Sequence, residues 1–319
     1  MGKRIVENLE MGMSWTSYIA SVYGVLKGAG WWQDELYKLM GQTGIALHFI
    51  MHERSCPSSV TVYPWTDEHL AMMDRIGVHS EAYCSHAGMN TFSLLQQAAL
   101  EHIKESIDRG IGVVVWAPSP VLEFGIIYGY DDEDGVLYVH ACLPQEPEPL
   151  LYSNLGRSEV PMLFYQTFKG RVHVEPERVY RESLRYGVGE WNKPFHENEH
   201  YASGRKAYDN LIGTLERGDY SPFGLAYSLA VYAEAKSALA QYLRLVAAEC
   251  APLARVGQAA ALYQEIAARY ARLTALAPFS MNPVVKPEDL PQMIALVRGS
   301  KALEESAMQV ISGVVGANA

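Results

Sequence analysis

Apolar side chains recur at helical spacing near the start of the chain. Between Ser17 and Leu39 they stand three or four residues apart, with a break at 28–30, "GAG". This spacing predicts two helices joined by a turn. A further helix is predicted over 90–110, where Asn90 provides the cap and Gly110 the left-handed terminator.

Short runs rich in β-branched and aromatic residues predict strands. Three such runs follow one another at 111–117, 122–130 and 135–142, and an acidic turn, "DDEDG", joins the last two. Two more are predicted at 45–51 and 58–65. Helices followed by a mainly antiparallel sheet indicate an α+β domain, which we expect to occupy residues 1–175.

The second part of the chain has a different pattern. From Gly204 it is rich in alanine, with apolar residues at helical spacing and a break near Pro252. The pattern predicts an all-α helical bundle over 176–319, with irregular structure up to about residue 203. Lys236 is expected on a solvated face, whereas Glu234, with alanines four residues before and after it, is expected to point inward.

Composition narrows the function classes. The 319 residues are 49% hydrophobic, and 36 acidic against 26 basic residues give a net charge of -10. That balance excludes the basic footprint that nucleic acids and anionic membranes require. No stretch approaches the roughly 20 apolar residues that span a bilayer. We therefore expect a cytoplasmic protein with no cofactor, and the apolar bundle suggests a homodimer.

Two histidine groups have the chemistry of metal ligands. His48 and His52 would lie on one side of a helix, but their surroundings look like strand and loop. His79, Cys84 and His86 lie close together with no fourth ligand at a familiar spacing. The alternatives are an ordinary structural role for the first pair and ordinary loop residues for the second group, and we expect no metal.

Two spaced motifs carry the functional hypothesis. In "TSYIASVYGVLKGAGWWQDELYKLMG", Ser17 begins a helix, Gly30 follows thirteen residues later, and Glu35 follows five after that. In "EFGIIYGYDDEDGVLYV", Glu123 heads an otherwise apolar strand, with Gly129 six residues on, an acidic turn and a return strand.

The two motifs resemble those of papain-like cysteine enzymes. The resemblance is closest to the bacteriocin-leader-processing peptidases and to the N-terminal-domain family of butirosin biosynthesis protein H, an acyltransferase family. It covers roughly residues 10–175. It implies a papain-like fold in which Ser17 stands where the family has its nucleophilic cysteine and Glu123 where it has its histidine, facing each other across a cavity.

Other positions also depart from the family. The aspartate or asparagine at the end of the return strand falls near His140 or Ala141, and Met11 replaces the glutamine that would help to form an oxyanion hole. A serine must lose its proton to a base as it attacks, and a carboxylate with an ordinary pKa near 4.3 is a feeble base.

Two interpretations of the substituted site follow. His140 would complete a triad with Ser17 and Glu123 only if a bulge shifts the register, because strict alternation points it away. In the alternative, Ser17 caps the first helix and Glu123 is satisfied by nearby backbone amides or a hydroxyl.

We therefore expect the former catalytic cleft to bind a small-molecule or peptidyl ligand, with Trp15, Trp116 and Cys142 beside it. The alternative function is that of an acyltransferase or amide hydrolase using Ser17 or a relocated cysteine, Cys84 or Cys142, as nucleophile. A purely structural partner within a biosynthetic cluster is a third possibility.

Overall fold

The computed structural model describes residues 2–142, 147–194 and 196–316. The chain divides into two compact units: unit 1 is Met1–Leu36 with Pro64–His173, and unit 2 is Tyr37–Tyr63 with Val174–Ala319. Unit 1 combines helices with an antiparallel sheet, so the α+β class indicated by the sequence is present. Residues 37–63, which the sequence analysis placed in the first domain, group with the helical unit.

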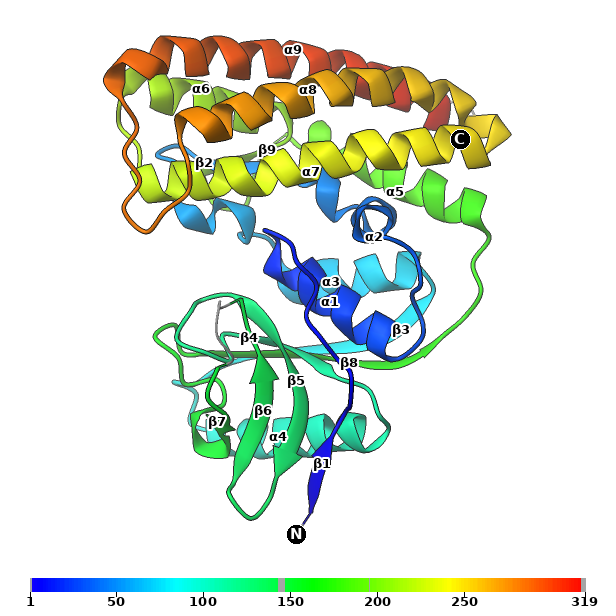
Figure 1. Cartoon of the computed structure of the whole chain (residues 1–319), viewed down its shortest axis with the longest axis vertical. Helices are drawn as coiled ribbons and strands as arrows, with labels where there is room; N and C mark the ends of the chain where they lie inside the picture. The colour runs from blue at the N-terminus through cyan, green and yellow to red at the C-terminus, as the bar shows by residue number, and fades with distance from the viewer. Residues whose placement is uncertain (1, 143–146, 195, 317–319) are drawn as a thin grey trace. The chain divides into compact units, whose positions relative to one another are not determined.

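Unit 1 contains most of the strands (Figure 1). Its elements in chain order are β1 (Lys3–Ile5), α1 (Ser17–Gly28), α3 (Trp65–Arg75), β3 (Val78–His86), α4 (Phe92–Asp108), β4 (Val113–Trp116), β5 (Phe124–Asp131), β6 (Val136–His140), β7 (Leu150–Leu151), the 3₁₀ helix η3 (Tyr152–Asn154) and β8 (Met162–Arg171).

The sheet of unit 1 has the order β3-β8-β4-β5-β6-β7, with β1 also paired to β5. All of its pairings are antiparallel. Helix α4 lies behind the sheet in the view of Figure 1, and its Ile103 and Ile107 share an apolar core with Val113 and Ile127. Helix α1 packs on β5, where a Cβ added at Gly24 would lie 2.9 Å from the Ile126 side chain.

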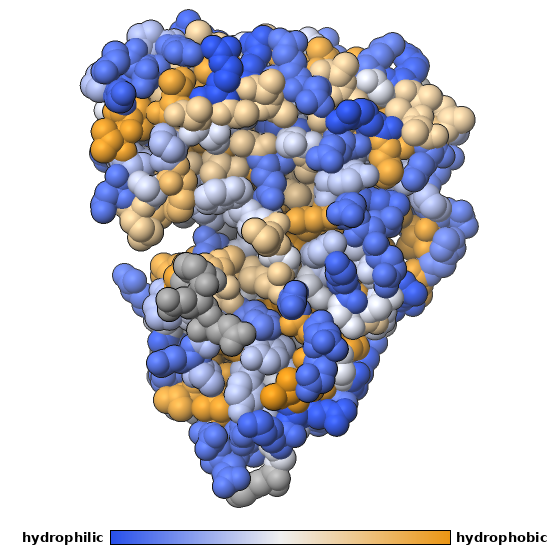
Figure 2. Space-filling view, viewed as in Figure 1, coloured by the Kyte–Doolittle hydropathy of each residue, from blue (hydrophilic) through white to orange (hydrophobic). Residues whose placement is uncertain are grey.

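Unit 2 is almost entirely helical. Its elements are α2 (Leu36–Thr43, which begins at the last residue of unit 1), η1 (Ile45–Leu47), β2 (Ile50–His52), η2 (Pro57–Val60), α5 (Pro176–Trp191), β9 (Tyr201–Ser203), α6 (Arg205–Arg217), α7 (Pro222–Glu249), η4 (Ala251–Val256), α8 (Gly257–Leu276), η5 (Pro287–Asp289) and α9 (Leu290–Val315). Figure 2 shows polar and weakly apolar residues interspersed over α7 and α8, whose exposed alanines include Ala261 and Ala268.

The core of the bundle contains a polar network that the sequence analysis did not predict. Lys236 is fully buried, and its Nζ donates to Glu304 Oε1 at 2.6 Å. Tyr208 and Tyr263 donate to the same carboxylate at 2.6 and 2.9 Å. The solvated position expected for Lys236 was therefore wrong, and Glu234, which was expected inside, is only half-buried.

Four segments form elements other than those predicted. In place of the strand predicted over 45–51, residues 45–47 form the 3₁₀ helix η1 and strand β2 begins only at Ile50. Residues 78–86 form strand β3, although His79, Cys84 and His86 were interpreted as ordinary loop residues, and residues 176–191 form α5 rather than irregular structure. The strand predicted over 58–65 is absent, because residues 57–60 form the 3₁₀ helix η2 and Trp65 begins α3. No helix in the described part of the chain is long and apolar enough to cross a membrane.

Candidate functional site

The structure brings Ser17 and Glu123 into direct contact. Ser17 is the first residue of α1 and is only 4% exposed. Its hydroxyl donates to Glu123 Oε2 at 2.5 Å and accepts the backbone N–H of Phe124 at 3.1 Å. Ser17 and Glu123 therefore lie close together, as the resemblance implied. They form a direct hydrogen bond and do not face each other across a cavity.

Ser17 does not cap the helix with its side chain. The cap position is Thr16, which makes no side-chain capping hydrogen bond. The capping role proposed for Ser17 was therefore wrong, because its hydroxyl is directed at the start of β5. The hydroxyl partner proposed for Glu123 is present.

The loop between β4 and β5 positions Glu123. Trp116 and Phe124 are opposite each other at the ends of the two strands, and the Ala117 N–H donates to the Glu123 carbonyl at 2.8 Å. Ala117 has a φ of 47°, a left-handed conformation that is unusual for a residue with a side chain. This backbone hydrogen bond holds the ends of the loop together and leaves the Glu123 side chain half-buried beside α1.

His140 does not join the pair. The bulge that a triad requires is present between Ile127 and Gly129, and it leaves His140 opposite Ile126. However, the ring stacks on Tyr128 with centroids 4.3 Å apart, and Nε2 lies 2.8 Å from the Leu9 carbonyl oxygen. Among the described residues, His140 makes no hydrogen bond to Ser17 or Glu123, so the predicted Ser17, His140, Glu123 triad is not assembled in this structure.

Cys142 lies close to the pair but is not activated. Its Sγ lies 3.8 Å from the Phe124 carbonyl oxygen. Although the residue as a whole is exposed, burial of the thiol, together with the nearby Glu123 carboxylate, raises its pKa to about 12. Burial also raises the pKa of the Cys84 thiol. Nucleophilic cysteines need a lowered pKa, so both shifts oppose thiolate formation near neutral pH.

The two tryptophans differ in exposure. Trp15, two residues before Ser17, is 42% exposed. Trp116 is 8% exposed, and its ring packs 4.7 Å from Trp65 and 4.9 Å from Phe124. Its indole Nε1 is buried without a hydrogen-bond partner. Trp15 can therefore meet a ligand at the surface, whereas Trp116 mainly forms the apolar support of the site.

Sequence reasoning missed the Phe124 N–H, which completes the hydrogen bonding of Ser17. Every residue except proline has a backbone N–H, so the sequence does not mark this one as special. It is recognised only from the packing of α1 against the start of β5. Sequence reasoning also missed His69, which is fully buried and stacks on Tyr18 with ring centroids 3.4 Å apart. The apolar helix pattern around His69 gave no functional signal.

The histidine groups do not form a metal centre. His52 lies in strand β2, and His79, Cys84 and His86 are spread along the nine residues of β3. Within the described ranges, no three histidine, cysteine, aspartate or glutamate residues are arranged to hold a metal ion.

No protein-family model matches this chain, and no curated protein matches it. The papain-like resemblance therefore depends on the residues of this chain and their spacing alone.

Proposed function

We propose that unit 1 is a papain-like domain whose former catalytic site binds a small-molecule or peptidyl ligand without covalent chemistry. The direct contact between Ser17, the first residue of α1, and Glu123, the residue immediately before β5, supports the assignment. So does the packing of α1 on an antiparallel sheet. In this proposal the two motifs keep their positions relative to each other, while Ser17 and Glu123 replace the cysteine and the histidine of the family.

One observation carries the proposal: the Ser17 hydroxyl is held between two protein groups. Its proton is donated to Glu123 and its oxygen accepts the Phe124 N–H. A nucleophile of this lineage needs an imidazole that accepts its proton and later returns it to the leaving group. The imidazole of His140 is instead engaged by Leu9 and Tyr128.

The chemistry of the site favours a ligand that donates hydrogen bonds. Glu123 contributes a half-buried carboxylate, and Trp15 contributes an exposed aromatic surface close by in the chain. A carboxylate in a partly desolvated position interacts strongly with amines and hydroxyls. The proposed ligand class is therefore an amine- or hydroxyl-bearing small molecule, or a peptidyl group with such an end.

The test is a screen of primary-amine and amino-alcohol fragments against the whole chain, followed by NMR. We expect saturable binding that is weakened at least tenfold by Glu123→Gln, which keeps the shape but removes the charge. Asp134→Asn, in the β5–β6 turn, is the matched control and should bind normally. Fragments that bind equally well to Glu123→Gln would contradict the proposal.

An active acyltransferase or amide hydrolase remains the second candidate function. The specific observation in its favour is the 2.5 Å hydrogen bond from Ser17 to a carboxylate, which is the direction in which a base removes the proton. This function predicts turnover of p-nitrophenyl acetate through an acyl group on Ser17. Turnover unchanged in Ser17→Ala would exclude Ser17 as the nucleophile.

A further inference from the structure

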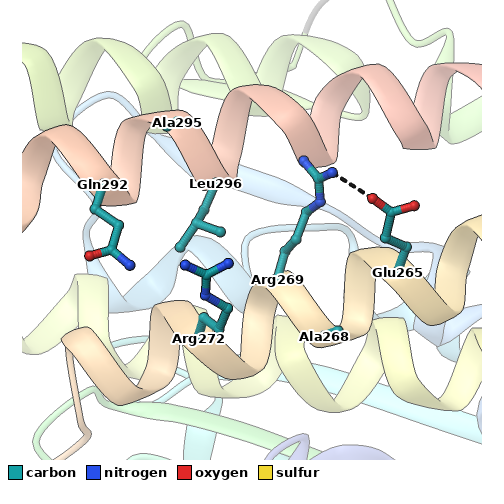
Figure 3. Close-up of a pocket in the computed structure, with 7 residues that line it drawn as sticks. All are labelled: Glu265, Ala268, Arg269, Arg272, Gln292, Ala295 and Leu296. Carbon is teal, nitrogen blue, oxygen red and sulfur yellow. Dashed lines mark hydrogen bonds and ion pairs between the residues drawn. The ribbon is translucent and has the colours of Figure 1, made fainter.

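A groove runs between helices α8 and α9 of unit 2, far along the chain from the Ser17–Glu123 pair. Its volume is about 450 Å³, within the range of small-molecule sites. Its apolar lining consists of the exposed alanines Ala268 and Ala295 and of Leu296, which is only 7% exposed. The polar groups of the groove come from both helices, as Figure 3 shows.

Arg269 is held in place before any ligand arrives. Its Nη2 donates to Glu265 Oε1 at 2.6 Å, one helical turn earlier. Its Nη1 lies against the backbone of α9 at Gly299, where an added Cβ would be only 1.7 Å away. The lack of a side chain at position 299 therefore creates the space that the Arg269 guanidinium occupies.

Arg272 and Gln292 supply donors that the protein does not use. Within the described part of the chain, neither side chain makes a hydrogen bond or an ion pair. In Figure 3 the two side chains extend toward each other from opposite helices, beside Leu296. The groove thus carries two guanidinium groups and one carboxylate, a local positive excess in a chain whose net charge is -10.

We propose that the α8–α9 groove binds an organic anion, a phosphate or carboxylate group with a small apolar portion. The anionic group accepts hydrogen bonds from Arg272, Arg269 and the Gln292 amide, since guanidinium groups match both anions in bidentate geometry. The apolar portion contacts the exposed alanines Ala268 and Ala295 and the small exposed part of Leu296. Because Arg272 is exposed and Arg269 is only half-buried, we expect a dissociation constant of about 1 mM.

The experiment titrates phenyl phosphate, benzoate, inorganic phosphate and neutral benzyl alcohol into the whole chain. Binding is followed by NMR on the arginine Nε–Hε and glutamine side-chain amide resonances. We expect saturable shifts with the aromatic anions that weaken as salt is added. Tighter phenyl phosphate binding would assign the site to phosphates, and tighter benzoate binding to carboxylates.

Three variants make the test specific. Arg272→Gln should weaken anion binding about tenfold, the loss expected for one charged hydrogen-bonding group. Gly299→Ala should weaken it by displacing the Arg269 guanidinium. Arg298→Gln, on the same helix but paired with Glu216, is the control and should bind normally. The proposal is overturned if no anion saturates, if benzyl alcohol binds equally well, or if the folded Arg272→Gln variant keeps full affinity.

Discussion

The Ser17 hydroxyl has both of its hydrogen-bonding roles filled by the start of β5. It donates to the Glu123 side chain and accepts from the neighbouring Phe124 backbone. Because Ser17 is buried, replacing it would leave a carboxylate and an amide without this partner. The Ser17 hydroxyl therefore contributes to the attachment of α1 to the sheet.

We predict that Ser17→Ala lowers the free energy of unfolding by about 1–3 kcal/mol, the cost of leaving buried hydrogen-bonding groups unpaired. Chemical denaturation with urea measures the change. Ser93→Ala, an exposed serine in α4, is the matched control and should change stability by less than about 0.5 kcal/mol. Equal effects of the two substitutions would contradict the role given to Ser17.

Cys142 should be a slow thiol. With a pKa of about 12 it has very little thiolate near neutral pH, although its thiolate would be intrinsically more nucleophilic. These opposing effects predict alkylation by iodoacetamide at pH 8 about a hundredfold slower than for an ordinary thiol. The rate should rise about tenfold per pH unit, because the thiolate fraction does so below the pKa.

The control for Cys142 is Glu123→Gln. Removing the carboxylate takes away one of the two causes of the raised pKa, so alkylation should become faster, while burial keeps it slower than for a free thiol. Peptide mass spectrometry follows each cysteine separately. A fast reaction of Cys142 at pH 7 in the unaltered protein would support a relocated nucleophile instead.

The resemblance of the two spaced motifs to the papain-like family predicted that Ser17 and Glu123 lie near each other, and the two side chains are in contact. The position of the His140 ring could not be predicted in the same way. The extra residue at Tyr128 changes the register of β5 against β6, but the ring direction is set by Leu9 and Tyr128, and the sequence does not show those contacts. The direction of a side chain such as His140 is set by its tertiary contacts and cannot be read from the local sequence pattern.

At the scale of elements, one carboxylate connects the helices of the bundle. Glu304 of α9 accepts hydrogen bonds from Tyr208 of α6, Lys236 of α7 and Tyr263 of α8. Burial, followed by the Glu304 charge, raises the pKa of Tyr208 and Tyr263 well above 10, so both stay neutral donors. The loss of any one member of such a buried network destabilises the fold, because it leaves another buried polar group without its partner.

We predict that Lys236→Met lowers the free energy of unfolding by about 3–5 kcal/mol, since it leaves a buried carboxylate without its counter-charge. The double variant Lys236→Met with Glu304→Gln should recover part of this loss. The amide oxygen still accepts a tyrosine hydroxyl, and no buried charge remains. A double variant that loses the sum of both single effects would show that the ion pair is not coupled.

Most of the predicted helices are present, but helix α5 and strand β3 were not predicted. The residues "VHSEAYCSH" lack apolar alternation because β3 is an edge strand, and residues 83, 84 and 86 are exposed. Lys236 was misplaced for the opposite reason. An alanine-rich helix that is buried on several sides has no clear polar face from which the position of a charge can be predicted.

At the scale of the whole molecule, the helical unit is discontinuous in sequence. Residues 37–63 supply contacts that residues 174–319 cannot replace: the Tyr232 hydroxyl donates to the Ile50 carbonyl at 2.5 Å, and the Phe49 ring lies 4.5 Å from that of Tyr208. Lys236 Nζ also lies 4.7 Å from the centre of the Phe49 ring. The sequence marked the composition change near residue 175 but gave no sign of this earlier segment, because the pairing is entirely non-local.

We predict that a fragment of residues 174–319 will lack fixed tertiary packing, because its core residues Tyr208, Tyr232 and Lys236 lose the segment that covers them. Near-UV circular dichroism and NMR dispersion measure this packing. The same fragment joined by a flexible linker to residues 37–63 is the control, and it should recover a cooperative unfolding transition. Equal cooperativity in the two fragments would contradict the division of the chain into these units.

The central claim is that the hydroxyl of Ser17 is engaged by its neighbours and does not act as a nucleophile. The most direct test is to incubate the whole chain with a fluorophosphonate and to measure intact mass and modified peptides over time. The account predicts no adduct on Ser17 under conditions that fully label a serine hydrolase. Stoichiometric modification of Ser17 in the folded protein, abolished in Glu123→Gln, would contradict it and would establish a serine–carboxylate enzyme.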